Sequence, residues 1–213
     1  MASAEQAAGQ ALERLREGNR RFVAALGDDG ATTGASPKHT LVTDQTPFAI
    51  ILGCSDSRAP AEILFDQGLG DLFVIRVAGN VVAPSQVGSV EFAAAQFRTP
   101  LVVVLGHSSC GAVIATLEEL ERPTERRSPN LHSIVDRIRP SVEGLLDTPL
   151  VADRAALIEQ AVRADIRASA NHLRHGSAIL ERLIDQRGLA VVGAEYSLIT
   201  GEVDFFDQVP DGG

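Results

Sequence analysis

Residues 48–58 read Phe-Ala-Ile-Ile-Leu-Gly-Cys-Ser-Asp-Ser-Arg, and residues 101–111 read Leu-Val-Val-Val-Leu-Gly-His-Ser-Ser-Cys-Gly. Each stretch is an apolar run followed by a glycine, a residue that can bind a metal, and small hydroxyl residues. Runs that are apolar at every position are typical of strands buried on both faces of a parallel sheet. The two stretches therefore predict two buried strands, each of which ends at a candidate ligand.

The rest of the chain alternates short apolar strands with helical stretches, which predicts an α/β fold on a mainly parallel central sheet flanked by helices. We expect four parallel strands and an antiparallel edge strand. They lie at 48–53, 72–76, 101–105, 189–196 and, after a hairpin about Thr200-Gly201, 203–206. Helices are expected at 60–66, 85–98, from Gly111 onwards, 130–145, 151–174 and 176–187.

Residues 4–26 carry apolar side chains at spacings of three and four, with charged residues in the gaps, and predict an amphipathic helix. This helix would either pack on its own domain or form an arm that grips a second subunit, and the sequence leaves both interpretations open. Residues 27–47 are rich in glycine and polar residues and predict a loop. We expect a single domain over 1–213, with an N-terminal helical arm over 1–30 and a frayed tail over 208–213.

The composition is that of an acidic globular protein, with 213 residues, 45% of them hydrophobic, and a net charge of −9. No basic face is indicated, so nucleic acid is not an expected partner. The first residues lack a basic segment followed by an apolar one, and no apolar run approaches the roughly 18–20 residues of a membrane span. We therefore expect a cytoplasmic protein without a membrane partner.

The only two cysteines lie in the two quoted stretches, as Cys54 and Cys110, and His107 precedes Cys110 by three residues. In open α/β sheets ligands bind beyond the carboxyl ends of the strands, so these residues can meet if their strands are neighbours. Two thiolates and one imidazole are good zinc ligands, and a zinc ion with three protein ligands keeps a position open for water. Two ordinary core cysteines, or a disulfide between them, are the alternatives that the spacing leaves open.

Asp56 and Arg58 follow Cys54 on the same turn. An arginine can hold a carboxylate through two hydrogen bonds and fix its direction. Beside a metal, Asp56 could accept a hydrogen bond from a bound hydroxide, or it could swing onto the metal as a fourth ligand and displace the water. An ordinary loop salt bridge is the alternative, and at the surface it would contribute little.

Together, Cys54-Ser-Asp-Ser-Arg58 and Gly106-His-Ser-Ser-Cys-Gly111 resemble the signature of the β-class carbonic anhydrases, and the resemblance extends from about Gln45 to Val113. It implies the reversible hydration of carbon dioxide to bicarbonate and a proton, by attack of zinc-bound hydroxide. It also implies self-association, as a homodimer or a dimer of dimers, because the pockets of this family form at the subunit interface.

The resemblance assigns roles to individual residues. It implies one Zn²⁺ ion per chain, bound by Cys54, His107 and Cys110. It implies that Asp56 and Arg58 form a catalytic dyad, with Asp56 as a fourth ligand in a closed state of the site.

Two further residues match positions that contact substrate in the family, namely Gln45 and the pocket aromatic Phe73. Members that lack this glutamine instead use a tryptophan, an arginine and a tyrosine to bind inhibitory bicarbonate. Here Ile51 stands in place of that tryptophan, although Arg76 and Tyr196 are present. The sequence therefore favours the open, non-regulated type of zinc site.

Other functions remain as alternatives. A zinc hydrolase of carbon disulfide-like substrates on the same fold, or a non-enzymatic module stabilised by a closed zinc site, would share the same ligands. A serine hydrolase is disfavoured because Cys110 stands where the G-x-S-x-G motif needs its final glycine. His172 and His175 lie on one helical face and could bind a second metal, but a solvated helix surface is the preferred interpretation.

Overall fold

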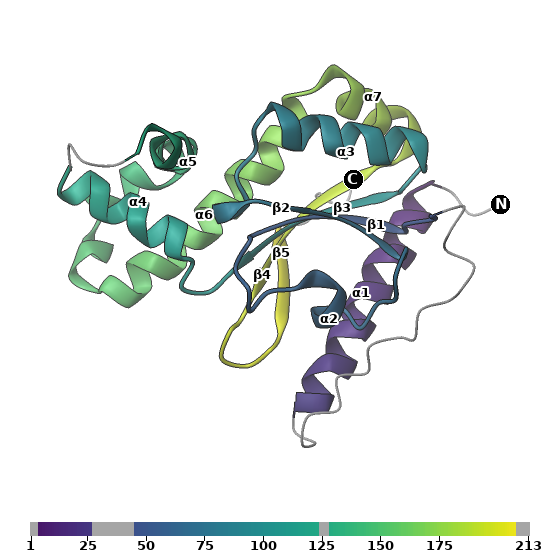
Figure 1. Ribbon diagram of the computed structural model, residues 1–213, viewed down its shortest axis with the longest axis horizontal. Helices are drawn as coiled ribbons and strands as arrows, with labels where there is room; N and C mark the ends of the chain where they lie inside the picture. The colour runs from purple at the N-terminus through teal and green to yellow at the C-terminus, as the bar shows by residue number, and fades with distance from the viewer. Residues whose placement is uncertain (1–3, 27–44, 124–127, 208–213) are drawn as a thin grey trace.

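The computed structural model describes residues 4–26, 45–123 and 128–207. Its centre is a five-stranded sheet in the order β2-β1-β3-β4-β5 (Figure 1). The strands are β1 (Ala49–Gly53), β2 (Leu72–Arg76), β3 (Leu101–His107), β4 (Ala190–Tyr196) and β5 (Val203–Asp207). The first four are parallel and β5 is antiparallel to β4, which confirms the predicted fold class. Most of the loop predicted at 27–47, and the tail at 208–213, lie outside the described residues.

The two strands from the quoted stretches, β1 and β3, are neighbours in the middle of the sheet. Every residue of both strands is buried, as their continuous apolar sequence predicted. Because the two strands are parallel, their carboxyl ends reach the same edge of the sheet. β3 is two residues longer than predicted, so His107 is its last residue rather than the second residue beyond its end.

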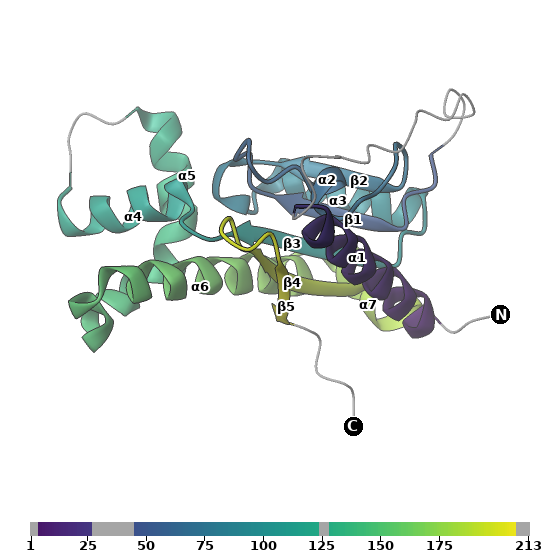
Figure 2. The same cartoon turned by 90° about the horizontal axis from the view of Figure 1, so that it is seen from below.

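Helices cover both faces of the sheet (Figures 1 and 2). One face carries α3 (Pro84–Gln96), α6 (Arg154–His175) and α7 (Ala178–Arg187), and the other carries α1 (Ala4–Leu26) and α2 (Ala61–Leu64). Beyond the carboxyl end of β3, α4 (Gly111–Glu121) and α5 (Pro129–Val142) pack against α6. Alternate strand residues divide between the two layers, so that Ile50 and Leu52 face α3 and α6 whereas Ala49 and Ile51 face α1 and α2.

Local sequence explains where the later helices begin. Ser128, Asp153 and Ser177 accept hydrogen bonds from backbone N–H groups in the first turns of α5, α6 and α7, as N-cap residues do. The short 3-10 segments η3 (Glu143–Asp147) and η4 (Pro149–Ala152) separate α5 from α6. The predicted end of α5 and start of α6 are therefore each displaced by three residues.

No helix in the described part of the chain combines the length and apolar character needed to cross a membrane.

The first helix, α1, packs on the sheet of its own chain. Leu15 is fully buried there, and Asn19 is buried one turn further on. The Asn19 amide donates hydrogen bonds to the carbonyls of Leu64 (3.2 Å) and Gly201 (3.0 Å) and accepts one from the backbone N–H of Val203 (2.9 Å). These bonds join α1 to α2 and to the β4–β5 hairpin. Packing on its own domain is thus observed, and contact of α1 with a second subunit stays a prediction.

Candidate metal centre

The two cysteines and His107 meet at the carboxyl edge of the sheet. Cys54 directly follows β1, His107 ends β3, and Cys110 is the N-cap of α4. Their ligand atoms all lie within 4.8 Å of one another, and all three residues are buried. Among the residues that the structure describes, this is the one group of three or more His, Cys, Asp or Glu side chains placed to hold a metal ion. The helical pair His172 and His175 is part of no such group in these ranges.

The distance between the two sulfurs distinguishes a disulfide from a pair of zinc ligands. Cys54 and Cys110 are free cysteines with their Sγ atoms 4.0 Å apart. A disulfide needs about 2.05 Å between its sulfurs, so the structure does not support that alternative. Two sulfurs bound tetrahedrally to one zinc ion at about 2.3 Å would lie about 3.8 Å apart. The observed separation therefore fits two thiolates that share a zinc ion.

His107 presents one ring nitrogen with its lone pair free. Nδ1 lies 3.0 Å from the carbonyl oxygen of Ser108. That oxygen can only accept a hydrogen bond, so Nδ1 carries the proton. The other nitrogen, Nε2, is buried and has no hydrogen-bond partner among the described residues. A buried polar atom normally has a partner, and an imidazole oriented in this way by its second nitrogen is typical of a metal ligand.

The two thiols affect each other's ionisation. The pKa of Cys54 is lowered, chiefly by its contact with the Cys110 thiol and further by the backbone N–H of Gly79. The pKa of Cys110 is raised, because its proton is bonded to the Cys54 sulfur and the group is buried. A divalent cation bound to both sulfurs would require both to be thiolates, because thiolates are the form that binds metal.

Asp56 and Arg58 form the predicted pair beside these ligands. Arg58 donates from Nε to Oδ1 (2.9 Å) and from Nη2 to Oδ2 (2.8 Å) of Asp56, and its backbone N–H also donates to Oδ1 (2.9 Å). The Arg58 hydrogen bonds hold the pKa of the Asp56 carboxyl well below its usual range, so this group is ionised at neutral pH. Its Oδ2 lies 3.7 Å from Nε2 of His107. A carboxylate of fixed direction therefore faces the ligand cluster.

Arg76 holds the loop that carries Cys54 and Asp56, a role that the sequence did not reveal. Its Nε donates to the carbonyl oxygen of Cys54 (3.2 Å) and its Nη2 to that of Asp56 (2.5 Å). The sequence indicated Arg76 only as a match to an arginine that binds bicarbonate in some β-class carbonic anhydrases. Its place at the end of the adjacent strand, in register with Gly53, is the signal that could have indicated this role.

Gln45 and Phe73 lie toward the opposite edge of the sheet. Phe73 is in register with Ile50, near the start of both strands, and Gln45 is an exposed residue that precedes β1. At about 3.3 Å per residue, the rest of the strand separates Phe73 from the ligand cluster by about 13 Å. Within one chain, therefore, the structure does not bring these two residues to the candidate metal ligands. Phe73 instead packs against the exposed ring of Phe92.

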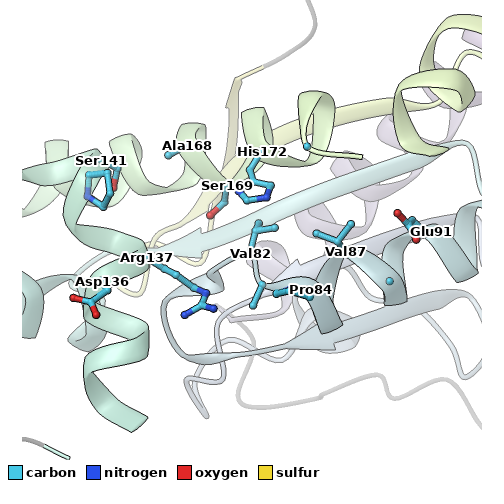
Figure 3. Close-up of a pocket in the computed structure, with 14 residues that line it drawn as sticks. Val82, Pro84, Val87, Glu91, Asp136, Arg137, Ser141, Ala168, Ser169 and His172 are labelled. Atoms are coloured by element: carbon cyan, nitrogen blue, oxygen red, sulfur yellow. The ribbon is translucent and has the colours of Figure 1, made fainter. Parts of the chain in front are cut away.

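A separate cavity of about 760 Å³ opens between α3, α5 and α6 (Figure 3). Its lining includes Val82, Arg137, Ser169 and His172. None of the predicted site residues lines it. It is therefore distinct from the ligand cluster.

Comparison with known proteins identifies the family. The family model described as carbonic anhydrase matches residues 49–203. A carbonic anhydrase of Mycolicibacterium smegmatis is 37% identical over 203 residues, which cover 94% of each chain. Carbonic anhydrase 2 of Mycobacterium tuberculosis is 40% identical over 199 residues, which cover 93% of each chain. This chain belongs to the carbonic anhydrase family, in its β class.

Solved structures agree with this assignment. The β-carbonic anhydrase CafA of Aspergillus fumigatus matches with a TM-score of 0.72 and 26% identity, over 81% of each chain. One of the tetrameric β-carbonic anhydrases of Sordaria macrospora shares the fold, with a TM-score of 0.67 and 24% identity over 76% of this chain and 82% of that one. The resemblance drawn from the two motifs is confirmed, and with it the enzyme class, carbonic anhydrase, a lyase.

Proposed function

We propose that this chain catalyses the reversible hydration of carbon dioxide to bicarbonate and a proton, with a zinc ion held by Cys54, His107 and Cys110. The observation that carries the proposal is the convergence of two thiols and an imidazole nitrogen without a partner. Sulfur and imidazole ligands suit zinc rather than magnesium or calcium. Three protein ligands leave one position for water, which is typical of catalytic zinc sites.

The residues around the candidate ligands would orient the nucleophile. When bound, zinc supplies Lewis acidity that lowers the pKa of a water and produces a nucleophile near neutral pH. Carbon dioxide is small and apolar, so the protein must chiefly direct that nucleophile. The Asp56 carboxylate would accept a hydrogen bond from the attacking oxygen and so direct a remaining lone pair toward the carbon. Arg58 holds the carboxylate in this direction, and Arg76 holds its loop.

The hydrogen bonds of the dyad support an open site. Arg58 engages both carboxylate oxygens of Asp56, and a carboxylate engaged in this way is not free to turn onto the metal. With Oδ2 only 3.7 Å from Nε2 of His107, a small rotation after loss of the Arg58 contact would supply the fourth ligand of a closed site.

Gln45 and Phe73 are proposed to contact substrate in the site of a second copy of the chain, since both lie far from the ligands of their own. This arrangement requires a homodimer or a dimer of dimers. The exposed Phe92 beside Phe73 offers apolar surface for such a contact, and the neighbour from Sordaria macrospora is tetrameric. Sedimentation in solution would distinguish the two states. A single domain over 1–213 and a cytoplasmic location stay predictions.

Stopped-flow hydration of carbon dioxide by zinc-loaded protein tests the proposal. We expect rapid hydration and metal content of one zinc ion per chain. Turnover of carbon disulfide without carbon dioxide hydration would favour the related zinc hydrolase. Stoichiometric zinc with neither activity would favour a non-enzymatic zinc module.

A further inference from the structure

A buried carboxyl group lies behind the metal ligands and has no part in the chemistry above. Asp165, on α6, is 2% exposed, and its Oδ2 accepts a hydrogen bond of 3.2 Å from Nδ2 of Asn80, which is also 2% exposed. Burial of polar side chains costs free energy unless they are paired. The pair is therefore a specific polar contact beside the apolar layer between α6 and the sheet.

Asn80 closes an unusual turn. The 3-10 turn η2 (Ala78–Asn80) has two consecutive residues in the left-handed region, Gly79 with φ 68° and Asn80 with φ 43°. Only glycine, and to a lesser degree asparagine and aspartate, adopt this conformation readily. A Cβ atom on Gly79 would lie 2.8 Å from Cδ1 of Ile138 and 3.0 Å from Cβ of Ala112, so a larger residue here would also require its neighbours to shift. The Asn80 side chain anchors this turn to α6.

The turn directs a hydrogen-bond donor at a metal ligand. The backbone N–H of Gly79 points at Sγ of Cys54, with 3.4 Å between nitrogen and sulfur. A hydrogen bond to a thiolate stabilises its charge and fixes the direction of its remaining lone pairs. Asp165, Asn80 and the Gly79 N–H thus form a continuous chain of contacts from α6 to Cys54.

We propose that Asp165 is a positioning residue for the metal centre, which acts through Asn80 to hold the turn that aims the Gly79 N–H at Cys54. The inference rests on the proposed function, since it takes the Cys54 sulfur to be a metal ligand. Burial raises the pKa of the Asp165 carboxyl to about 8, so this group is largely uncharged at neutral pH. An amide of the same shape should therefore replace it.

Zinc affinity and a cobalt spectrum test this role in the full-length protein. Asp165→Leu and Asn80→Gly remove the two halves of the side-chain contact, and Asn80→Gly keeps the backbone freedom that the turn needs. Asp165→Asn is the conservative variant. Ser169→Ala is the matched control, because Ser169 is 6% exposed and lies one turn further along α6. Zinc dissociation constants would come from competition with a chromophoric chelator, and thiolate-to-cobalt charge-transfer bands from the Co²⁺-substituted protein.

We expect Asp165→Leu and Asn80→Gly to weaken zinc binding by about 10- to 100-fold and to shift the charge-transfer bands. Asp165→Asn and Ser169→Ala should match the wild type in both measurements. A folded Asp165→Leu or Asn80→Gly protein with wild-type zinc affinity and an unshifted cobalt spectrum would overturn the proposal. So would an effect of Ser169→Ala equal to theirs.

Two other outcomes are also distinguishable. If Asp165→Leu does not fold, the Asn80→Gly protein decides the question. A wild-type protein that binds no zinc would contradict the proposed function itself, whereas normal zinc binding in wild type and all variants would contradict only the role of Asp165.

Discussion

Replacement of Asp56 by asparagine should leave the metal ligands in place and remove the acceptor that faces them. The carboxylate receives hydrogen bonds of 2.9, 2.9 and 2.8 Å from Arg58. An asparagine oxygen could still accept the bonds now made to Oδ1, but its NH2 group would face the Nη2 donor of Arg58. The pair would separate, and the negative charge that we propose aligns the nucleophile would be lost.

The size of the effect follows from the surroundings of Asp56. A hydrogen bond to a charged group contributes about 1.5–3 kcal/mol, and the Asp56 side chain is only 18% exposed, so solvent screens little of this. We expect kcat/KM for carbon dioxide hydration to fall by about 10- to 200-fold, which is this 1.5–3 kcal/mol converted at about 1.4 kcal/mol per factor of ten. Stopped-flow assays on zinc-loaded protein would measure the rate, and elemental analysis of the same sample should show unchanged zinc content.

Asp66→Asn is the matched control for this substitution. Asp66 also pairs with an arginine, Arg21, at 2.6 Å, and its side chain is 22% exposed, but it lies on the α1 side of the sheet, outside the ligand cluster. Asparagine tolerates its backbone φ of 46°. The control should keep wild-type kcat/KM. Full activity of zinc-loaded Asp56→Asn protein, or an equal loss in the control, would refute the role assigned to Asp56.

Three other substitutions test how the fold supports the site. Asn19→Ala leaves three backbone groups without their partner, two of them buried and one half-buried; at about 1 kcal/mol per hydrogen bond and about 2–4 °C per kcal/mol, the Tm should fall by roughly 6–12 °C. An unchanged Tm would show that the docking of α1 does not depend on Asn19. In the folded wild type the pKa of Asp165 is raised to about 8, against the ordinary value of 3.8 in the unfolded chain. The free energy of unfolding of the wild type therefore declines as the pH rises between these two values. Asp165→Asn should remove this decline, so its free energy of unfolding should exceed that of wild type by more at pH 8 than at pH 5 in urea titrations, and equal differences at both pH values would contradict the assignment. Gly79→Ala combines a backbone φ of 68° with the contact at Ile138 and should destabilise the protein by about 1–3 kcal/mol; unchanged urea unfolding would contradict the close packing of the turn.

Much of the sheet and the ligand cluster was predictable because the information is local. Two continuous apolar runs define the central strands, and Gly53 and Gly106 directly precede the first candidate ligand on each of them. His107 and Cys110 lie within one short motif. Only the pairing of the two strands, which brings Cys54 to them, had to be supplied by general rules for α/β sheets.

The supporting contacts could not be predicted, because they join distant segments. Asn80 and Asp165 are 85 residues apart, and apolar periodicity does not distinguish an aspartate that faces the core from one that faces water. Arg76 was visible in the sequence, but its hydrogen bonds depend on the register of β2 against β1. Gln45 was assigned by resemblance alone, and strand direction places it at the opposite edge of the sheet from its own chain's ligands.

Zinc content of the wild type, compared with Cys54→Ser, His107→Ala and Cys110→Ser proteins, tests the central claim most directly. Elemental analysis should find one zinc ion per chain in wild type and none retained by the three variants after dialysis. Hydration activity should follow the metal. A wild-type protein without stoichiometric zinc, a covalent bond between the two sulfurs in mass spectra, or full zinc content in every variant would contradict the account.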